Sequence, residues 1–394
     1  MENTKNTSLD GVRGLAAVTV IFSHLVLWFY PYLSSGNTKD SGVNDFTHAL
    51  FNSPFTFIFK GTSAVMLFFI ISGYVLSLTF ARNGITVDKI QSSACKRYLR
   101  LGIPVAASVI ICVLLMSFNV FHAKEYGITL PLSSAYTGEF ELLDAIKQAL
   151  YGSMLFGQGS FNYVLWTISI EFYGSMLVFA LWALFGKNQN ILRLVCLLIS
   201  WFTIASGTPF VWGLGLFPVG VLLSTFKFNP SHSIYKKAGC FVMLAAGLYL
   251  LGFNPYSSAY SAISDLYSST PDIDVSWGFF IPIVGAILTI ASIVAFPSNF
   301  SLLRSIVPQF LGRRSFSLYL LHSVILTIIS THMVKAFGVG FYAFASSLIL
   351  TMLITILLSL IFYKFVDAKA IYISSVFSKR IFENKKPAVA GLNV

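Results

Sequence analysis

Charged side chains are scarce in this sequence. Lys, Arg, Asp and Glu make up only 10% of its 394 residues, whereas soluble proteins carry about 25%. Hydrophobic residues make up 56%, and the mean hydropathy is +0.77. This composition excludes an ordinary soluble globular domain and predicts an all-α polytopic membrane protein surrounded by membrane lipids.

Cysteine is also scarce, and its spacing is uninformative. Cys95, Cys112, Cys196 and Cys240 have neither the spacing of a metal site nor that of a disulfide framework, so we expect no bound metal. Acidic residues are outnumbered, 15 against 26 Lys and Arg, which gives a net charge of +11. Membrane proteins collect such a basic excess in their cytoplasmic loops. The charge therefore gives no reason to expect nucleic acid as a partner.

Ten apolar segments are long enough to cross a hydrocarbon core of about 30 Å. They lie near residues 12–32, 56–80, 102–121, 163–185, 190–206, 209–226, 238–253, 277–297, 315–334 and 340–364. Only five of the 26 basic residues would then lie on the outer side of the membrane, namely Lys39, Lys60, Lys124, Lys147 and Lys335. This asymmetry predicts about ten transmembrane helices with both termini cytoplasmic. We expect a transmembrane domain over 1–370 and a partly disordered cytoplasmic tail over 371–394.

The first apolar segment carries two ionisable residues on one face. Arg13 and His24 are eleven residues apart, which is three helical turns plus about 20°, so they share a face roughly 16 Å apart along the axis. An ionisable group inside a membrane is costly, and it is a functional-site hypothesis by default. A buried imidazole can act as a general base or a nucleophile. The alternative interpretation is a structural hydrogen bond between helices.

Two further ionisable residues lie deep in apolar segments. Glu171 is eight residues into the fourth segment, in LWTISIEFY, and His322 lies in LGRRSFSLYLLHS. Helical rise predicts that both lie roughly 12–16 Å from a membrane surface, at the level of His24. Glu171 is a candidate to orient the His24 imidazole, as a carboxylate does in a catalytic triad. Each residue can also be a structural partner between helices, and for His322 we favour that interpretation.

A basic patch is expected where the first, third and ninth segments meet the cytoplasm. It comprises Arg13, Arg97, Arg100, Arg313 and Arg314, with Asp10 among them. Such a patch offers bidentate partners for phosphates, although the positive-inside rule alone explains most of it. Ser72 and Tyr74 flank a glycine in FFIISGY, where close helix packing is the favoured explanation. The amphipathic run Glu139–Phe156 is expected to lie at the outer interface.

In this order, the motifs resemble those of the integral-membrane acyltransferase family 3. The resemblance rests on LDGVRGLAAVTVIFSH at 9–24, FFIISGY at 68–74, KRYLRLGIP at 96–104, LWTISIE at 165–171, FPVG at 217–220 and LGRRSFSLYLLH at 311–322. It covers nearly the whole chain. The sequence departs from the family at its end, where a frequent Glu-x-Pro is replaced by Asp367-Ala368-Lys369.

The resemblance implies an O-acyltransferase of the cytoplasmic (inner) membrane. It would transfer an acyl group, expected to be acetyl, from cytoplasmic acetyl-CoA to a hydroxyl of an envelope saccharide. Such an acceptor is O-antigen of lipopolysaccharide or another lipid-linked or surface glycan. The family's Arg-x10-His pair falls on Arg13 and His24, and its carboxylate falls on Glu171. His24 and Glu171 are then the expected catalytic residues. Those expected to bind the donor are Arg13, Arg97 and Arg100, and the candidates for substrate contact or structure are Ser72, Tyr74, Trp166 and His322.

Other functions are compatible with the same residues. A transporter of a glycan or small molecule could use mid-membrane His and Glu as a proton relay, although matching broken helices in two halves are not evident in the sequence. A membrane scaffold or sensor would use the polar residues only to join helices. Within enzymes, the acceptor could instead be a peptide, an antibiotic or a lipid.

Overall fold

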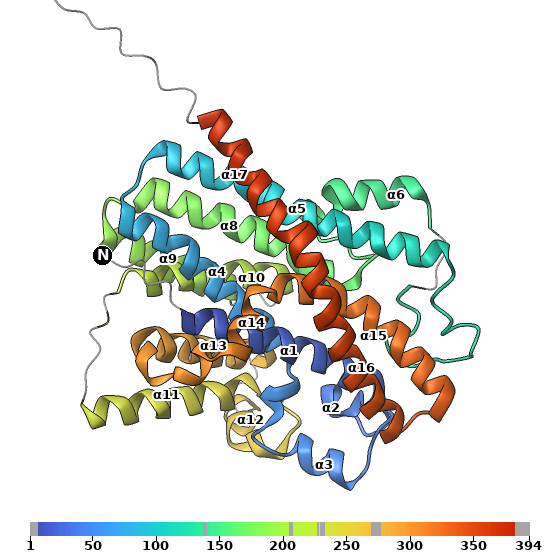
Figure 1. Cartoon of the computed structure of the whole chain (residues 1–394). Coiled ribbons are helices and arrows are strands. Elements are labelled where there is room, and N and C mark those ends of the chain that lie inside the picture. Colours follow the sequence, from blue (N-terminus) through green and yellow to red (C-terminus); the bar gives the residue numbers. More distant parts are fainter. Residues whose placement is uncertain are drawn as a thin grey trace, which may run out of the picture.

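The computed structural model describes residues 7–136, 140–204, 208–226, 228, 233–268 and 277–382. Within these ranges the fold is entirely helical, and no strand occurs. The long helices lie beside one another and run broadly across the molecule (Figure 1). The predicted all-α class is confirmed.

In the described part of the chain, eight helical stretches have the length and hydropathy of a membrane span. They include α1 (Thr7–Phe29), α4 (Gly61–Asn83), α5 (Val87–Ser117), α8 (Trp166–Phe185) with the 3-10 turn Tyr163–Leu165 before it, α11 (Ile234–Leu251), α13 (Trp277–Ala295) and α15 (Ser315–Phe337). The last stretch comprises α16 (Phe341–Phe362), a π-helical turn (Tyr363–Asp367) and α17 (Ala368–Phe382). The fifth and sixth predicted spans correspond to α9 (Gln189–Ile204) and α10 (Pro209–Ser224), which are apolar but only 16 residues long. These features make the chain a multi-pass membrane protein.

The shorter elements connect these helices. They are α2 (Tyr32–Ser35), α3 (Asp45–Phe51), α6 (Leu142–Lys147), a π-helical turn (Gln148–Gly152), α7 (Ser153–Phe156), α12 (Ser261–Ser268), α14 (Ile306–Arg313) and 3-10 turns at Thr56–Phe59, Ser258–Tyr260, Pro297–Asn299 and Ser301–Arg304.

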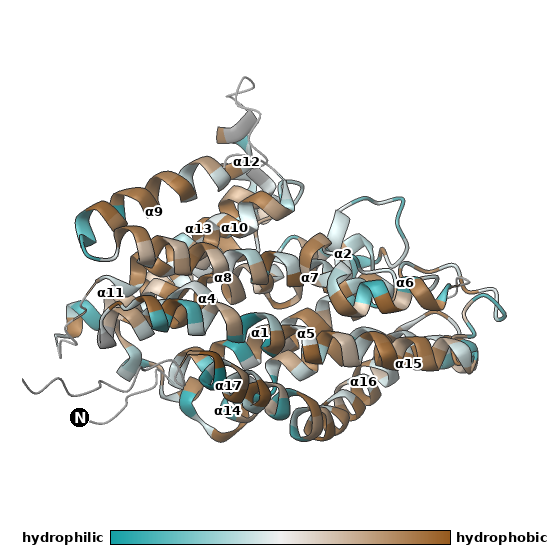
Figure 2. Cartoon of the chain, turned by 90° about the horizontal axis from the view of Figure 1, so that it is seen from above, coloured by the Kyte–Doolittle hydropathy of each residue, from teal (hydrophilic) through white to brown (hydrophobic). Residues whose placement is uncertain are grey.

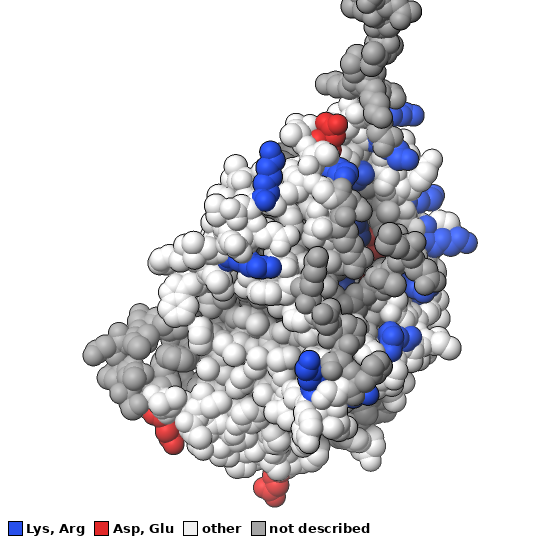
Figure 3. All heavy atoms as spheres, turned by 90° about the vertical axis from the view of Figure 1, so that its left-hand side faces the viewer, with Lys and Arg blue, Asp and Glu red and all other residues white. Residues whose placement is uncertain are grey.

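Charge is distributed unevenly between the two ends of the helices. Apolar residues dominate the helices, and hydrophilic ones concentrate at helix ends and in connections (Figure 2). One end holds the α4–α5 and α8–α9 connections and the beginning of α11, and we call it the basic side. It lies at the left of Figure 1 and faces the viewer in Figure 3, where Lys and Arg are widely spread and Asp and Glu are few. The positive-inside rule predicts that this side is cytoplasmic.

Glycines allow two pairs of helices to approach closely. A Cβ atom on Gly14 of α1 would lie 2.7 Å from the backbone nitrogen of Gly312 in α14. A Cβ atom on Gly220 of α10 would lie 2.5 Å from the backbone nitrogen of Tyr74 in α4. Only glycine permits such contacts. The first contact brings Arg13 and Arg313, the neighbours of these glycines, to one place.

The segment before α8 does not lie at the outer interface. Asn162 Nδ2 donates a 2.9 Å hydrogen bond to the carbonyl oxygen of Leu320, which is only five residues from the N-terminal end of α15. By helical rise this level lies about 8 Å from the basic end of α15. Leu150, in the turn between α6 and α7, accepts a 2.5 Å hydrogen bond from the hydroxyl of Tyr98, the neighbour of the buried Arg97 in α5. The chain therefore runs inward along α6 and α7, and α8 begins deep in the molecule. The predicted interfacial position of this run is wrong, and its first residue, Glu139, lies outside the described residues.

The C-terminal part of the chain continues the last helix on the basic side. Residues 371–382, predicted to belong to a tail, form most of α17, which packs along α5 (Figure 1). The hydroxyl oxygens of Ser92 and Ser378 lie 2.7 Å apart across this contact. The rest of the predicted tail, 383–394, lies outside the described residues.

Candidate active site

A cavity of about 260 Å³ lies between α1, α4, α5, α8, α14, α15 and the turn between α16 and α17. Four arginines line it, namely Arg13, Arg97, Arg100 and Arg313, together with the acids Asp10, Glu171 and Asp367. Arg97 is buried and Arg13 is half-buried, whereas Arg100 and Arg313 are exposed. The positive charge thus extends from the solvent of the basic side into the protein.

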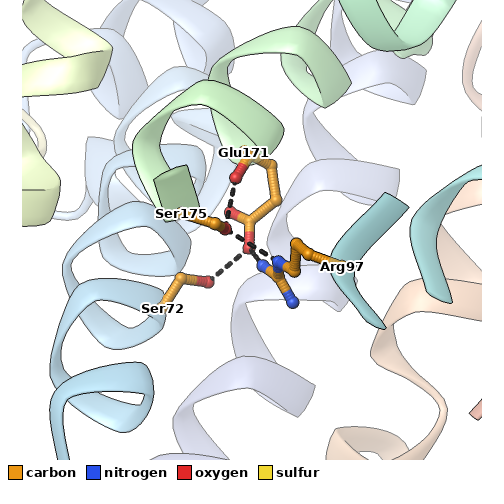
Figure 4. Close-up of polar contacts among 4 residues, drawn as sticks. All are labelled: Ser72, Arg97, Glu171 and Ser175. Carbon is orange, nitrogen blue, oxygen red and sulfur yellow. Dashed lines mark hydrogen bonds and ion pairs between the residues drawn. The ribbon is translucent and has the colours of Figure 1, made fainter. Parts of the chain in front are cut away.

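Glu171 and Arg97 form the buried end of this cavity (Figure 4). The Arg97 guanidinium forms an ion pair with Glu171 Oε1, and Ser72 Oγ donates a 2.8 Å hydrogen bond to the same oxygen. Arg97 Nε donates to Ser175 Oγ at 2.7 Å, and that hydroxyl donates to the carbonyl oxygen of Glu171 at 2.6 Å. These contacts join α4, α5 and α8, and they leave Arg97 committed to a carboxylate.

The predicted contact between Glu171 and the His24 imidazole is not formed. Because α8 begins deep in the molecule, Glu171 lies in the arginine-lined cavity toward the basic side. His24 is hydrogen-bonded to His322 instead, with its Nδ1 lying 2.9 Å from His322 Nε2. The predicted depth of Glu171 is wrong because it was counted from the outer surface of the membrane, where α8 does not begin.

His24 and His322 form a coplanar pair between α1 and α15. Their ring centroids are 5.1 Å apart and their planes differ by 6°. His322 is fully buried, and its Nδ1 lies 2.7 Å from the carbonyl oxygen of Tyr319. The histidine expected to be structural is thus the direct partner of the one expected to be catalytic.

Tyr319 connects the cavity with the histidine pair. Its side chain lines the cavity, and its ring centroid lies 5.7 Å from that of His322. Its hydroxyl donates a 2.6 Å hydrogen bond to the carbonyl oxygen of Val164 and lies 2.8 Å from Thr167 Oγ1. Tyr319 therefore lines the arginine-lined cavity and contacts His322.

Tyr163 lies on the other side of the histidine pair. Its ring meets the His24 ring edge to face, with centroids 5.4 Å apart. Its position is fixed by the preceding residue, because Asn162 accepts a 2.8 Å hydrogen bond from Ser323 and donates to Leu320. The Tyr163 hydroxyl is buried and has no hydrogen-bond partner among the described residues. The ring that packs against His24 thus carries a hydroxyl without a partner among the described residues.

The structure divides the sequence-predicted candidates into three groups. Arg13, Arg97, Arg100, Glu171 and Ser72 line the cavity, and His24 and His322 form the pair beyond it. Tyr74 and Trp166 are not among the lining residues. Tyr74 packs at the glycine contact of α4 with α10, as expected for close packing, and the Trp166 side chain is exposed at the first turn of α8.

Sequence reasoning missed several residues of the site. Asp367 lines the cavity and accepts a 3.3 Å hydrogen bond from Ser317, but it stands where the sequence departs from the family pattern, so the motif does not predict it. Tyr319 precedes His322 by three residues and so shares its helix face, a signal that was available in the sequence. Tyr163 had no local signal, because only the fold brings it to His24. Among the described residues, His, Cys, Asp and Glu do not gather in any group of three or more that could hold a metal.

Comparisons with known proteins show which family the chain belongs to. A family model described as an acyltransferase domain matches residues 6–364. The chain is 23% identical over 453 residues to "O-acetyltransferase PaAT-1" of Phomopsis amygdali, covering 96% of this chain and 85% of that protein. It is 23% identical over 390 residues to "Acyltransferase clz18" of Cochliobolus lunatus, covering 80% and 81%. No solved structure matches the chain.

Proposed function

The chain belongs to the acyltransferase family whose domain its residues 6–364 match, and on that premise we propose how this membrane O-acyltransferase works. It takes an acyl group, in our proposal acetyl, from acyl-CoA on the basic side and transfers it to a hydroxyl of an envelope saccharide. Such acceptors are O-antigen and other lipid-linked or surface glycans. The observation that carries the proposal is the arginine-lined cavity, which Tyr319 connects to His24 and His322.

The cavity suits the phosphates of coenzyme A. Arginine binds phosphate through two parallel hydrogen bonds. Arg97 is already paired with Glu171, so in our proposal Arg13, Arg100 and Arg313 hold the phosphates. Arg13 has a buried Nε without a hydrogen-bond partner among the described residues. A buried donor left unpaired is costly, and a donor phosphate would satisfy it.

The distance between the two parts of the site suits a tethered donor. Arg13 and His24 are both in α1, roughly 16 Å apart by helical rise. A pantetheine arm anchored by its phosphates near Arg13 would carry the thioester past Tyr319 to the His24 imidazole. The acceptor hydroxyl would then arrive from the opposite side of the membrane.

His24 can serve the transfer in two ways. As a general base, its Nε2 takes the proton of the acceptor hydroxyl while that oxygen attacks the thioester carbonyl. As a nucleophile, its Nε2 attacks the carbonyl first and carries the acyl group to the acceptor. In both cases the C–S bond breaks and the hydroxyl proton ends on the CoA thiolate. In our proposal the Tyr163 hydroxyl, which has no partner among the described residues, donates to the carbonyl oxygen as negative charge develops on it.

The proposal is tested with the purified protein in lipid vesicles, labelled acetyl-CoA and an envelope glycan. We expect label to move from acetyl-CoA to the glycan, and His24→Ala to lower kcat at least about 100-fold while acetyl-CoA still binds. Arg13→Ala should raise the KM for acetyl-CoA roughly tenfold or more, because a hydrogen bond to a charged group contributes about 1.5–3 kcal/mol.

Arg304→Ala is the matched control for the arginine. Arg304 is also on the basic side, but its guanidinium donates a 3.3 Å hydrogen bond to the carbonyl oxygen of Ser298 and does not line the cavity. Its replacement should leave the KM unchanged. Movement of the glycan without label would indicate a carrier instead, and full transfer by His24→Ala would overturn the catalytic assignment.

A further inference from the structure

The histidine pair is part of a chain of three hydrogen-bonding groups. The carbonyl oxygen of Tyr319 lies 2.7 Å from His322 Nδ1, and that of Leu318 lies 3.3 Å from the same atom. His322 Nε2 lies 2.9 Å from His24 Nδ1. The chain thus runs from the backbone of α15 through one imidazole to the next.

These hydrogen bonds determine which nitrogen of each imidazole ring carries the hydrogen. A carbonyl oxygen only accepts hydrogen bonds, so His322 Nδ1 must carry the proton. In a neutral ring the other nitrogen, Nε2, is then an acceptor, and His24 Nδ1 must donate to it. This assignment follows from the partners of each nitrogen. It leaves the lone pair of His24 on Nε2.

We propose that His322 is a positioning residue that fixes the reactive tautomer of His24. The proposal rests on the function proposed above, in which His24 acts on the acyl donor or the acceptor hydroxyl. It does not depend on which of the two routes operates, because both need the lone pair on Nε2. An unpartnered histidine would instead distribute its proton between both nitrogens, and the ring could rotate.

The pair also stabilises the charged form of His24 during transfer. When Nε2 takes the acceptor proton, His24 becomes an imidazolium whose Nδ1–H still donates to His322. The proton then moves from His24 Nε2 to the CoA thiolate, so the protonation state of His322 does not change. The sequence suggested that the Glu171 carboxylate orients His24, but Glu171 is bound to Arg97 and Ser72. The His322 ring, held by the carbonyl oxygen of Tyr319, orients His24 instead.

Two substitutions of His322 separate positioning from packing. In His322→Gln, the side-chain amide oxygen lies where Nε2 lay and can still accept from His24. In His322→Asn, the shorter side chain can replace Nδ1 but cannot reach His24. We expect kcat to fall roughly 10²–10³-fold in His322→Asn and clearly less in His322→Gln. The KM for acetyl-CoA should change less than twofold in both, because the phosphates bind elsewhere.

The control is His332→Ala, on the same helix. His332 Nδ1 also bonds a backbone carbonyl, that of Ile328 at 2.8 Å, but its ring lies against His122 and Tyr126. Its removal should leave kcat unchanged. A further test adds free imidazole to His322→Gly, where the vacated space next to His24 should admit the ring and restore part of kcat.

The tautomer of His24 can also be measured directly, without an activity assay. In protein labelled with ¹⁵N-histidine in bilayers, His24 should show hydrogen on Nδ1, and this signal should be lost or redistributed in His322→Asn. A wild-type kcat in His322→Asn, or hydrogen on Nε2 of His24 in the native protein, would overturn the inference and leave the proposed function intact. Full transfer by His24→Ala would instead contradict the proposed function.

Discussion

At the scale of single residues, the ion pair of Arg97 and Glu171 shows how the fold accommodates charges inside the protein. The side chains of Arg97 and Glu171 are only 9% and 17% exposed. Each ion lost its hydration on folding, which costs several kcal/mol, and only the partner and the serine hydroxyls compensate. The pair therefore contributes little net stability, but leaving either ion without its partner would be costly.

Replacing one member of this pair should lower stability. We expect Glu171→Gln to reduce the free energy of unfolding by about 3 kcal/mol, because Arg97 is left as an uncompensated buried charge. The measurement is thermal unfolding of the protein in detergent. The double variant Arg97→Met, Glu171→Leu should recover most of the stability, as apolar residues of similar volume often do. Equal losses in the single and double variants would contradict this explanation.

At the scale of helices, close contacts position the site more than helix propensity does. The α4–α10 contact at Gly220 holds the part of α4 that carries Ser72, which donates to Glu171. The α1–α14 contact at Gly14 holds Arg13 near Arg313. Helices that touch backbone to backbone at a glycine have little freedom to shift. The contacts at Gly220 and Gly14 therefore fix the positions of the Ser72 and Arg13 side chains.

The same substitution should have opposite effects on two helices. In Gly220→Ala, the new methyl group would lie 2.5 Å from the backbone nitrogen of Tyr74, so α4 and α10 must separate. We expect a lower unfolding temperature and a loss of transferase activity.

The matched control is Gly239→Ala on α11. A Cβ atom there meets nothing within 4 Å, so alanine should be neutral or stabilise by up to about 1 kcal/mol through its helix propensity. The comparison measures the unfolding temperature and the amount of folded protein in the membrane. Similar behaviour of the two variants would show that the close contact is not required.

At the scale of the whole molecule, the orientation in the membrane decides what each end of the site meets. The arginine-lined cavity belongs to the basic side, together with the α8–α9 connection and α17. If this side is cytoplasmic, the cavity meets soluble acyl-CoA, and the acceptor reaches His24 from the outside. The reverse orientation would place the arginines away from the acyl-CoA supply, so topology is a direct test of the mechanism.

Cysteine labelling measures the orientation. Lys39 and Lys187 are both exposed and lie on opposite sides of the predicted topology. Of the native cysteines, Cys112, Cys196 and Cys240 are buried, and only the half-buried Cys95 should be replaced by serine. We expect an impermeant maleimide to label Lys39→Cys in intact cells or spheroplasts, and Lys187→Cys only after permeabilisation. The opposite pattern would contradict cytoplasmic termini.

The sequence alone determined the properties that depend on local composition and spacing. Hydropathy indicated a helical membrane protein, and the charge asymmetry indicated an orientation. Spacing on one helix placed Arg13 and His24 on a common face, and motif order indicated the family. These predictions needed no knowledge of packing, because a helix has a fixed rise and rotation per residue.

Only the tertiary structure decided which groups meet. The partner of His24 is 298 residues away in the sequence. Glu171, which helical rise alone would place at the level of His24, is bound to Arg97. Depth failed as a guide because α6 and α7 run into the molecule before α8 begins, and apolar character does not reveal where a helix starts. Hydrogen bonds between distant helices depend on their relative register and rotation, which packing of the whole chain sets.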